Sequence, residues 1–221
     1  MDPDRSHPDE RNADTASSAS LPPLHPFEEA RGAAVREVAP FTRTGDPAMM
    51  RLAEEASRGC GTMVGMVSLL EYAEEWVVAC VGTEAERIPR AVSFCAHAIL
   101  GPDITVVEDA SKDPRFRTNP FVTDEHHLRF YAGAPILDAT GLPLGAVCVC
   151  DAAPMTLSSA CHLHLRGLAD AASAVLESRL LLADAHDRYV PEAGRLKTRA
   201  RFDALLLTLL DLRSPEGSAR R

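Results

Sequence analysis

The sequence predicts an α/β fold of the α+β type, in which helices cover both faces of an antiparallel sheet. Two pairs of short apolar runs predict the sheet: "TMVGMVSLL" with "EEWVVACVG", and "LRFYAGAPIL" with "LGAVCVCD". A short polar stretch joins the two members of each pair, which is typical of a hairpin. Both faces of the second pair are largely apolar, so we expect this sheet to be covered on both sides.

Helical segments precede and follow these strands. In "GDPAMMRLAEEASRG" (45–59), Asp46 can cap the N-terminus, Pro47 suits the first turn and Gly59 can end the helix. After the last strand, apolar residues recur at helical spacing from Cys161 to Ala183. Since this pattern is longer than one small sheet can cover, we expect a long helix that has a further partner.

The chain divides into three parts. Residues 1–26 are a tail rich in Ser, Pro, Asp and Glu, a composition that predicts disorder. Residues 27–182 form the domain, and residues 183–221 form a helical extension that is locally basic from residue 195 onward. This extension favours a dimer or partner helix, with binding to a membrane surface as the alternative.

Composition argues against several classes of protein. The chain has 221 residues, is 46% hydrophobic and carries a formal net charge of −9, so nucleic acid is not an expected partner. No apolar run reaches the ~20 residues of a transmembrane segment, and the N-terminus lacks the features of a secretory signal. The six cysteines lack the spacing of a secreted disulfide scaffold. We therefore expect a cytoplasmic protein whose thiols are reduced.

A cysteine and a histidine stand two residues apart in "SFCAHAILGP" (93–102). Ser93 can cap a short helix here, and the Gly-Pro pair would end it. At about 100° per residue, Cys95 points into the protein, whereas His97 lies at the edge of the buried face. This geometry favours core packing for Cys95 over a reactive pair with His97.

Four sequence blocks resemble those of a GAF domain of the bacterial sensor type. They are "VSFCAHAI", "VVEDASKDPRFRTNP", "RFYAGAPI" and "LGAVCVCDAAPMTL", and the likeness extends from about Gly45 to Leu182. The resemblance implies a GAF/PAS-like central antiparallel sheet of five to six strands, with helices on both faces and long terminal helices. It also implies a small-molecule pocket beneath the short helix and the long loop, and homodimers that pair through the terminal helices.

The resemblance also implies which residues line this pocket and bind the ligand. Arg129 and Tyr131 share one face of a strand, where they can clamp a carboxylate or a phosphate. Alternatively, Arg129 pairs with Asp109 or Asp113 and holds the loop closed. The implied ligand-binding residues are Phe94, Cys95, His97, Asp109, Phe116, Arg129 and Tyr131.

No catalytic, metal-binding or cofactor-binding set is assigned. Cys148 and Cys150 lie on one face of a strand, but the sequence offers no further ligands that converge on them. Methionine-sulfoxide reductases of this fold need a resolving cysteine in the loop before the central strand. Here that loop reads "FVTDEHHLRF", which contains histidines and no cysteine. The bilin-binding and cyclic-nucleotide signatures of GAF domains do not fall in their expected places.

We therefore expect a small-molecule-sensing or regulatory protein that is not an enzyme and acts in signal transduction. Its expected partners are a small-molecule ligand, a second copy of the chain and a signalling protein bound through the C-terminal helices. Two alternatives stay open. One is a thiol-based redox protein that uses Cys95 with Cys148 or Cys150, and the other is a ligand-free dimerisation or adaptor module.

Overall fold

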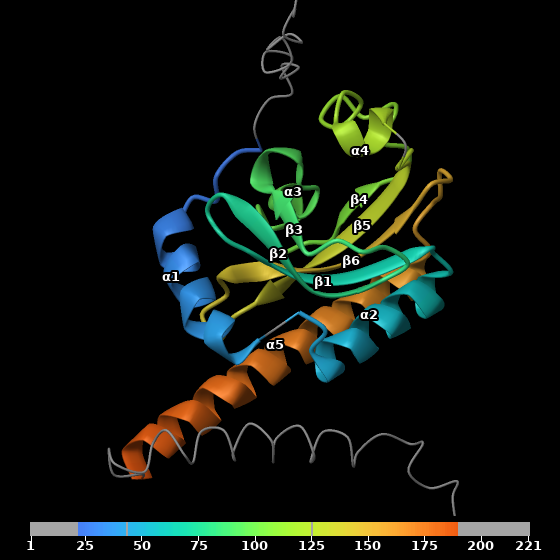
Figure 1. Cartoon of the computed structure of the whole chain (residues 1–221). Helices are drawn as coiled ribbons and strands as arrows, with labels where there is room; N and C mark the ends of the chain where they lie inside the picture. Colours follow the sequence, from blue (N-terminus) through green and yellow to red (C-terminus); the bar gives the residue numbers. More distant parts are fainter. Residues whose placement is uncertain (1–21, 43, 125, 190–221) are drawn as a thin grey trace, which may run out of the picture.

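A six-stranded antiparallel sheet runs through the middle of the domain in the order β3-β2-β1-β6-β5-β4 (Figure 1). The computed structural model describes residues 22–42, 44–124 and 126–189. The two predicted hairpins are present as β1–β2 and β5–β6, and β1 pairs with β6 at the centre of the sheet. The predicted fold class is therefore confirmed. The strands are β1 (Val64–Leu70), β2 (Glu74–Val81), β3 (Arg87–Pro89), β4 (Thr105–Val107), β5 (Phe130–Leu137) and β6 (Pro143–Asp151).

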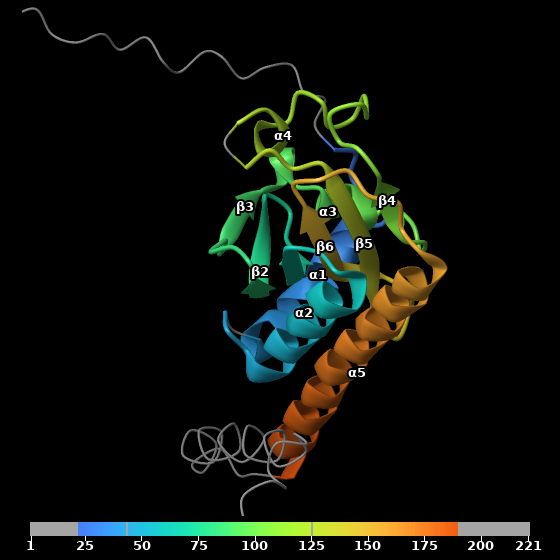
Figure 2. The same cartoon turned by 90° about the vertical axis from the view of Figure 1, so that its right-hand side faces the viewer.

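Three helices pack against the larger hydrophobic core on one side of the sheet. They are α1 (Glu28–Val38), α2 (Pro47–Cys60) and α5 (Ser159–Tyr189). α2 and α5 lie side by side beneath the sheet (Figure 1 and Figure 2). Along α5, Leu165, Ala172 and Leu176 are buried, as the helical spacing predicts. This side of the sheet is therefore covered by a largely apolar helical layer.

The ends of α2 follow the predicted signals only in part. The Asp46 carboxylate accepts hydrogen bonds from the backbone N–H groups of Ala48 and Met49, at 3.0 and 3.2 Å. The left-handed residue that ends the helix is Gly61 (φ 66°) rather than Gly59. Gly59 instead leaves room for the neighbouring helix, because a Cβ at this position would lie 2.3 Å from Nε2 of His164.

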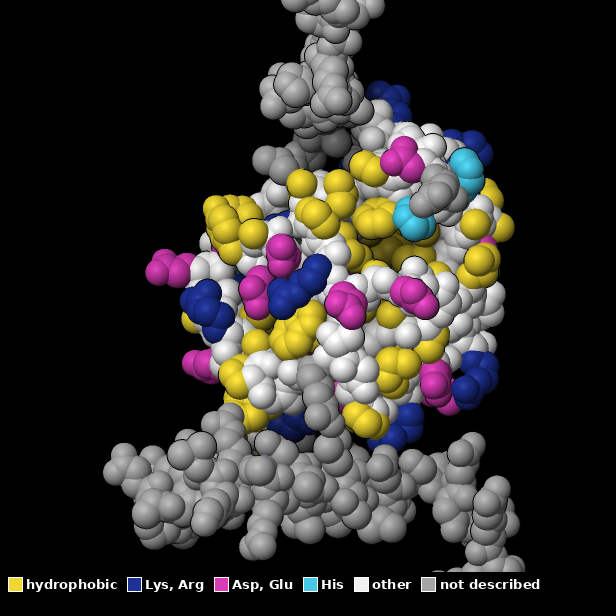
Figure 3. Space-filling view, viewed as in Figure 1, with side chains coloured by type: hydrophobic (Ala, Val, Ile, Leu, Met, Phe, Trp, Pro, Cys, Tyr) yellow, Lys and Arg dark blue, Asp and Glu magenta, His cyan; other side chains and the backbone are white. Residues whose placement is uncertain are grey.

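The opposite face of the sheet carries a second, smaller core. α3 (Cys95–Ala98), α4 (Pro120–Thr123) and the connections around them pack against it. Alternation along β5 and β6 places Tyr131, Cys148 and Cys150 on this face, whereas Phe130 and Val149 belong to the larger core. Figure 3 shows a hollow with hydrophobic walls in the upper half of the molecule. Helices thus cover both faces, as expected.

Several local elements differ from the sequence prediction. The helix expected within 93–102 is a single turn, α3, although the Ser93 hydroxyl still accepts a hydrogen bond from the Ala96 N–H at 3.0 Å. The sequence did not predict α1, β3 or α4. Short 3₁₀ turns, η1 (Ala39–Phe41) and η2 (Arg90–Val92), also occur. Within the described part of the chain, no helix has the length and apolar character needed to cross a membrane. The predictions for residues 1–21 and 190–221, the basic tail included, lie outside the described residues.

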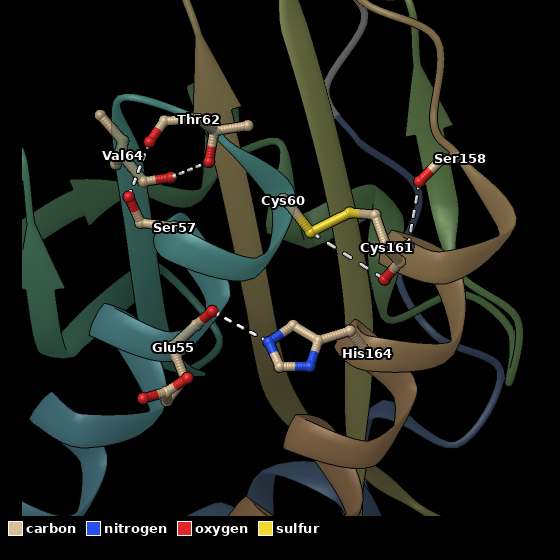
Figure 4. Close-up of a disulfide and its surroundings, with 8 residues drawn as sticks. All are labelled: Glu55, Ser57, Cys60, Thr62, Val64, Ser158, Cys161 and His164. Atoms are coloured by element: carbon tan, nitrogen blue, oxygen red, sulfur yellow. Dashed lines mark hydrogen bonds between the residues drawn. A yellow bond between two sulfur atoms is a disulfide. The ribbon is translucent and has the colours of Figure 1, made fainter.

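The expectation that all six cysteines are reduced is wrong for two of them. Cys60, at the end of α2, forms a disulfide with Cys161, in the first turn of α5 (Figure 4). The Cα–Cα distance is 5.1 Å, although the two residues are 101 positions apart in the sequence. They meet because the C-terminus of α2 lies beside the N-terminus of α5. Spacing along the chain carries no sign of this, because the two cysteines belong to different elements.

A buried salt bridge joins α5 to the other end of α2. Arg179 Nη1 lies 2.7 Å from Asp46 Oδ2, and both side chains are buried. Arg179 also donates a hydrogen bond to the carbonyl oxygen of Phe41, at 2.9 Å. α5 is therefore fixed to both ends of α2, by the disulfide at one end and by this ion pair at the other.

Candidate functional site

A cavity of about 380 Å³ opens on the side of the sheet that carries α3. Its walls come from β1, β2, β3 and the connection between the last two, from α3, from α4 and the segment after it, and from β5 and the end of β6. The volume lies at the lower end of the range of about 300–1,000 Å³ that is common for small-molecule sites. Apolar and aromatic residues dominate the inner wall. They include Met66, Ile88, Phe94, Cys95, Tyr131 and Cys148.

Stacked aromatic rings form the back of this wall. Phe94 stacks on Phe116 with a centroid distance of 4.0 Å and an interplanar angle of 9°. Tyr131 lies 5.3 Å from Phe94, and the half-buried His97 ring meets Phe116 edge-on at 4.7 Å. Burial, followed by the charge of Arg115, holds the pKa of His97 below its ordinary value. These contacts fix the Phe94 ring as a rigid surface for a flat or apolar ligand.

Two free thiols and a phenol lie against this surface. The Tyr131 O–H donates to Cys95 Sγ at 3.3 Å, and the Cys95 thiol donates to Cys148 Sγ at 3.7 Å. The Cys148 contact favours the Cys95 thiolate, but burial and the charge of Glu75 outweigh it and raise the pKa of Cys95. Hydrogen bonds with Cys150 and Cys95, together with burial, raise the pKa of Cys148 well above its ordinary value. The cluster is therefore suited to packing and hydrogen bonding rather than to nucleophilic attack.

One carboxyl group interrupts the apolar wall. Glu75 on β2 is 1% exposed, and its Oε2 accepts a hydrogen bond from the Ser93 O–H at 2.5 Å. The other oxygen, Oε1, is buried and has no hydrogen-bond partner among the described residues. A buried polar atom without a partner costs stability, so its presence in the wall of a cavity calls for an explanation.

Further charged side chains lie around the cavity. Glu84, Arg87, His126 and Asp151 belong to its lining. Arg87 on β3 forms an ion pair with Glu74 on the neighbouring strand β2, with Nη1 and Oε2 3.2 Å apart. Figure 3 shows histidine at the edge of the hollow and acidic side chains nearby. Carboxyl groups thus outnumber the basic side chains at this site.

The remaining residues that the sequence analysis proposed lie outside the cavity lining. Asp109 is bound by Lys112 at 2.9 Å and by the Ser111 hydroxyl, and these hydrogen bonds lower the pKa of Asp109 to about 2. Arg129 Nη1 donates to the carbonyl oxygens of Val122 and Leu128, at 3.0 and 2.9 Å. Arg129 therefore holds the end of α4 through backbone carbonyls. Arg129 thus lies outside the cavity lining, and among the described residues it forms no ion pair with Asp109 or Asp113.

Sequence analysis missed Glu75 and the role of Ser93 beside it. A signal for Glu75 was available, because it stands two residues before Val77 on the same strand. Period-2 alternation places both side chains on one face, and Val77 is buried there. An acidic residue in register with core residues is the kind of exception that marks a site.

The fold and the cavity define a GAF domain, and sequence comparison agrees. The GAF domain family model matches residues 35–180, so the chain belongs to this family. A cyclic di-GMP phosphodiesterase of Pseudomonas aeruginosa is 36% identical over 190 residues, which are 83% of this chain and 30% of that protein. The chain thus spans less than a third of the length of this relative.

Solved structures with low sequence identity share the same fold. The GAF domain of a phosphoenolpyruvate-protein phosphotransferase from Coxiella burnetii has a TM-score of 0.53 at 13% identity, covering 71% of this chain and 99% of that one. A type II free methionine-R-sulfoxide reductase from Thermoplasma acidophilum has a TM-score of 0.51 at 16% identity, covering 60% of this chain and 92% of that one. At such identities the likeness concerns the fold alone.

Proposed function

We propose that this GAF domain is a sensory or regulatory module that binds a small molecule in the cavity behind α3. The observation that carries the proposal is the cavity itself, with a rigid aromatic wall and one buried carboxyl oxygen that lacks a partner among the described residues. Small-molecule sites are typically concave and mostly apolar, with a few placed polar groups. Because the thiols in the wall have raised pKa values, recognition rather than catalysis is the proposed role.

The expected site residues then divide by role. Phe94, Cys95 and Tyr131 line the cavity and would touch the ligand directly. The others support the wall or hold the loop that carries it; they are His97, Asp109, Phe116 and Arg129.

The signal would pass through the sheet to α5 and from there to a second copy of the chain. β5 and β6 contact α3 on one face and α5 on the other, so a shift at α3 reaches α5 through two strands. α5 also exposes large apolar side chains, with Leu163 73% and Leu181 62% exposed. We expect the double variant Leu163→Ser/Leu181→Ser to shift a dimer toward monomers in sedimentation equilibrium. The matched control Tyr72→Ser, at an apolar position outside α5 that is 68% exposed, should leave the dimer intact.

The P. aeruginosa relative suggests a setting for such a module. Because 83% of this chain aligns with a part of a cyclic di-GMP phosphodiesterase, we propose that this domain acts as a sensory domain in cyclic di-GMP signalling. The phosphodiesterase activity is that of the relative. The proposal for this chain is the regulation of such an activity in a partner.

Native mass spectrometry of the protein from its own host tests the proposed function. The wild type should carry a non-covalent excess of a few hundred daltons that is lost on denaturation. The matched variant is Cys150→Phe, in which a larger side chain replaces a half-buried thiol of the cavity lining. This variant should lose the excess mass. A wild type that carries no excess mass, as expected of Cys150→Phe, would favour the adaptor module instead.

A thiol-based redox protein is the second candidate, because the Sγ atoms of Cys95 and Cys148 lie 3.7 Å apart. Attack by a thiol requires its thiolate, and the raised pKa values oppose this form in both residues. We therefore expect iodoacetamide to alkylate Cys95 of the folded protein far more slowly than the same thiol in the urea-unfolded chain. Alkylation of native Cys95 as fast as in the unfolded chain would favour the redox candidate.

A further inference from the structure

The cavity wall contains a buried hydrogen-bond acceptor that has no partner among the described residues. Glu75 Oε1 is this acceptor, and three donors of the wall already bind other atoms. The Ser93 O–H binds the other carboxyl oxygen, the Tyr131 O–H binds Cys95, and the Cys95 thiol binds Cys148. Leaving a buried acceptor without a donor costs stability, so a donor supplied by a ligand would be bound with a corresponding gain.

The charges around the cavity favour a cation as the source of this donor. Glu75, Glu84 and Asp151 all belong to the lining. Among the described lining residues Arg87 is the only Lys or Arg, and it is already paired with Glu74. Carboxyl groups at the walls of a partly apolar cleft make its potential negative, which attracts cations and repels anions.

We propose that the ligand is an organic cation whose protonated amine, or comparable N–H group, binds Glu75 Oε1. Its apolar body packs against the rings of Phe94 and Tyr131 in the adjoining wall. Only one of the two Glu75 carboxyl oxygens lacks a hydrogen bond, so a single N–H group of the ligand is enough to satisfy it. The inference rests on the proposed function and narrows the ligand to organic cations. Carboxylates and phosphates are excluded from this class. Arg129, which the sequence analysis expected to clamp an anion, lies outside the lining and donates to backbone carbonyl oxygens.

Three probes of similar shape and different charge test this inference. Phenethylamine, 2-phenylethanol and 3-phenylpropionate are titrated into the full chain, and dissociation constants are taken from ligand-observed NMR. We expect the amine to bind at least about tenfold more tightly than the alcohol, because its hydrogen bond to Glu75 is charge-assisted on both sides. The carboxylate should bind more weakly than both.

The variant Glu75→Gln preserves the shape of the side chain and removes its charge. It should weaken amine binding by about tenfold and alcohol binding much less, because only the amine loses an attraction between opposite charges. The matched control is Glu86→Gln, an exposed carboxyl group on the same β2–β3 connection that is not part of the cavity lining, which should change amine binding by no more than about twofold because exposed charges are screened. The comparison of the three probes on the wild type needs no variant, so it holds even if Glu75→Gln fails to fold.

The outcomes separate this inference from the proposed function. If the carboxylate binds as tightly as the amine, or if Glu75→Gln leaves amine binding unchanged, the cation is the wrong ligand class. In both cases the cavity still binds small molecules, and the proposed function stands. If no probe binds and the native protein carries no small molecule, the proposed function fails and this inference fails with it.

Discussion

Removal of the Cys60–Cys161 disulfide should destabilise the domain strongly. The bond closes a loop between positions 101 residues apart, across all six strands of the sheet. On the chain-entropy model, a cross-link over a loop of this length stabilises the folded state by about 4–5 kcal/mol at 25 °C. Since small domains have a total stability of about 5–15 kcal/mol, the bond would be a large share of it.

Urea unfolding of the variant Cys60→Ala/Cys161→Ala measures this contribution. With a slope of about 2 kcal/mol per molar urea, the midpoint should fall by about 2 M relative to the oxidised wild type. The wild type in strong reductant should unfold at the midpoint of the variant. The control Cys80→Ala removes a half-buried free thiol and should change the midpoint much less.

Two results would refute this reasoning. The first is an unchanged midpoint in both the reduced wild type and the double variant. The second is the alkylation of Cys60 and Cys161 in protein that is unfolded without reductant, since only free thiols react. Either result would mean that α2 and α5 are held by packing and by the Arg179 ion pair alone.

Three further changes probe the packing and the titration of the domain. Arg179→Met leaves the buried Asp46 carboxylate without its cation and should cost about 3 kcal/mol of unfolding free energy, while adding Asp46→Asn should restore part of the loss. In Gly133→Ala the new Cβ would lie 2.1 Å from the hydroxyl oxygen of the buried Tyr131, so we expect a loss of about 1–3 kcal/mol in urea unfolding, and a smaller loss would show that this ring can move. Burial and the charge of Arg115 lower the pKa of His97 from 6.5, so the unfolded chain binds more protons than the folded one below this pH. The free energy of unfolding should therefore fall as the pH drops from 6.5 toward the lower pKa that His97 has in the folded protein. The part of this pH dependence that is due to the imidazole should be absent in His97→Gln. An identical pH dependence in the variant would rule His97 out as its source.

Elements with strong local signals were predictable from the sequence. α2 was predicted from Asp46 and Pro47, and both hairpins were predicted from paired apolar runs with short turns. The elements that were missed have short or weak patterns. β3 has three residues and α4 has four, too few to show a period, and their positions depend on packing against the sheet.

Within the candidate site, the direction of a side chain on a single helix or strand was predictable from the sequence. Contacts between side chains on two different elements were not. The inward direction of Cys95 followed from helical geometry, and the shared face of Cys148 and Cys150 followed from strand alternation. The contact between Cys95 and Cys148 required the approach of α3 to β6. The pairing of Cys60 with Cys161 required α2 and α5 to end side by side.

A crystal structure of the protein purified from its own host, with no ligand added, tests the central claim most directly. We predict electron density for one small organic molecule in the cavity, with a nitrogen within hydrogen-bond distance of Glu75 Oε1 and its body against Phe94. A cavity that holds only ordered water, or that is closed by its own side chains, would contradict the claim that this domain binds a small molecule.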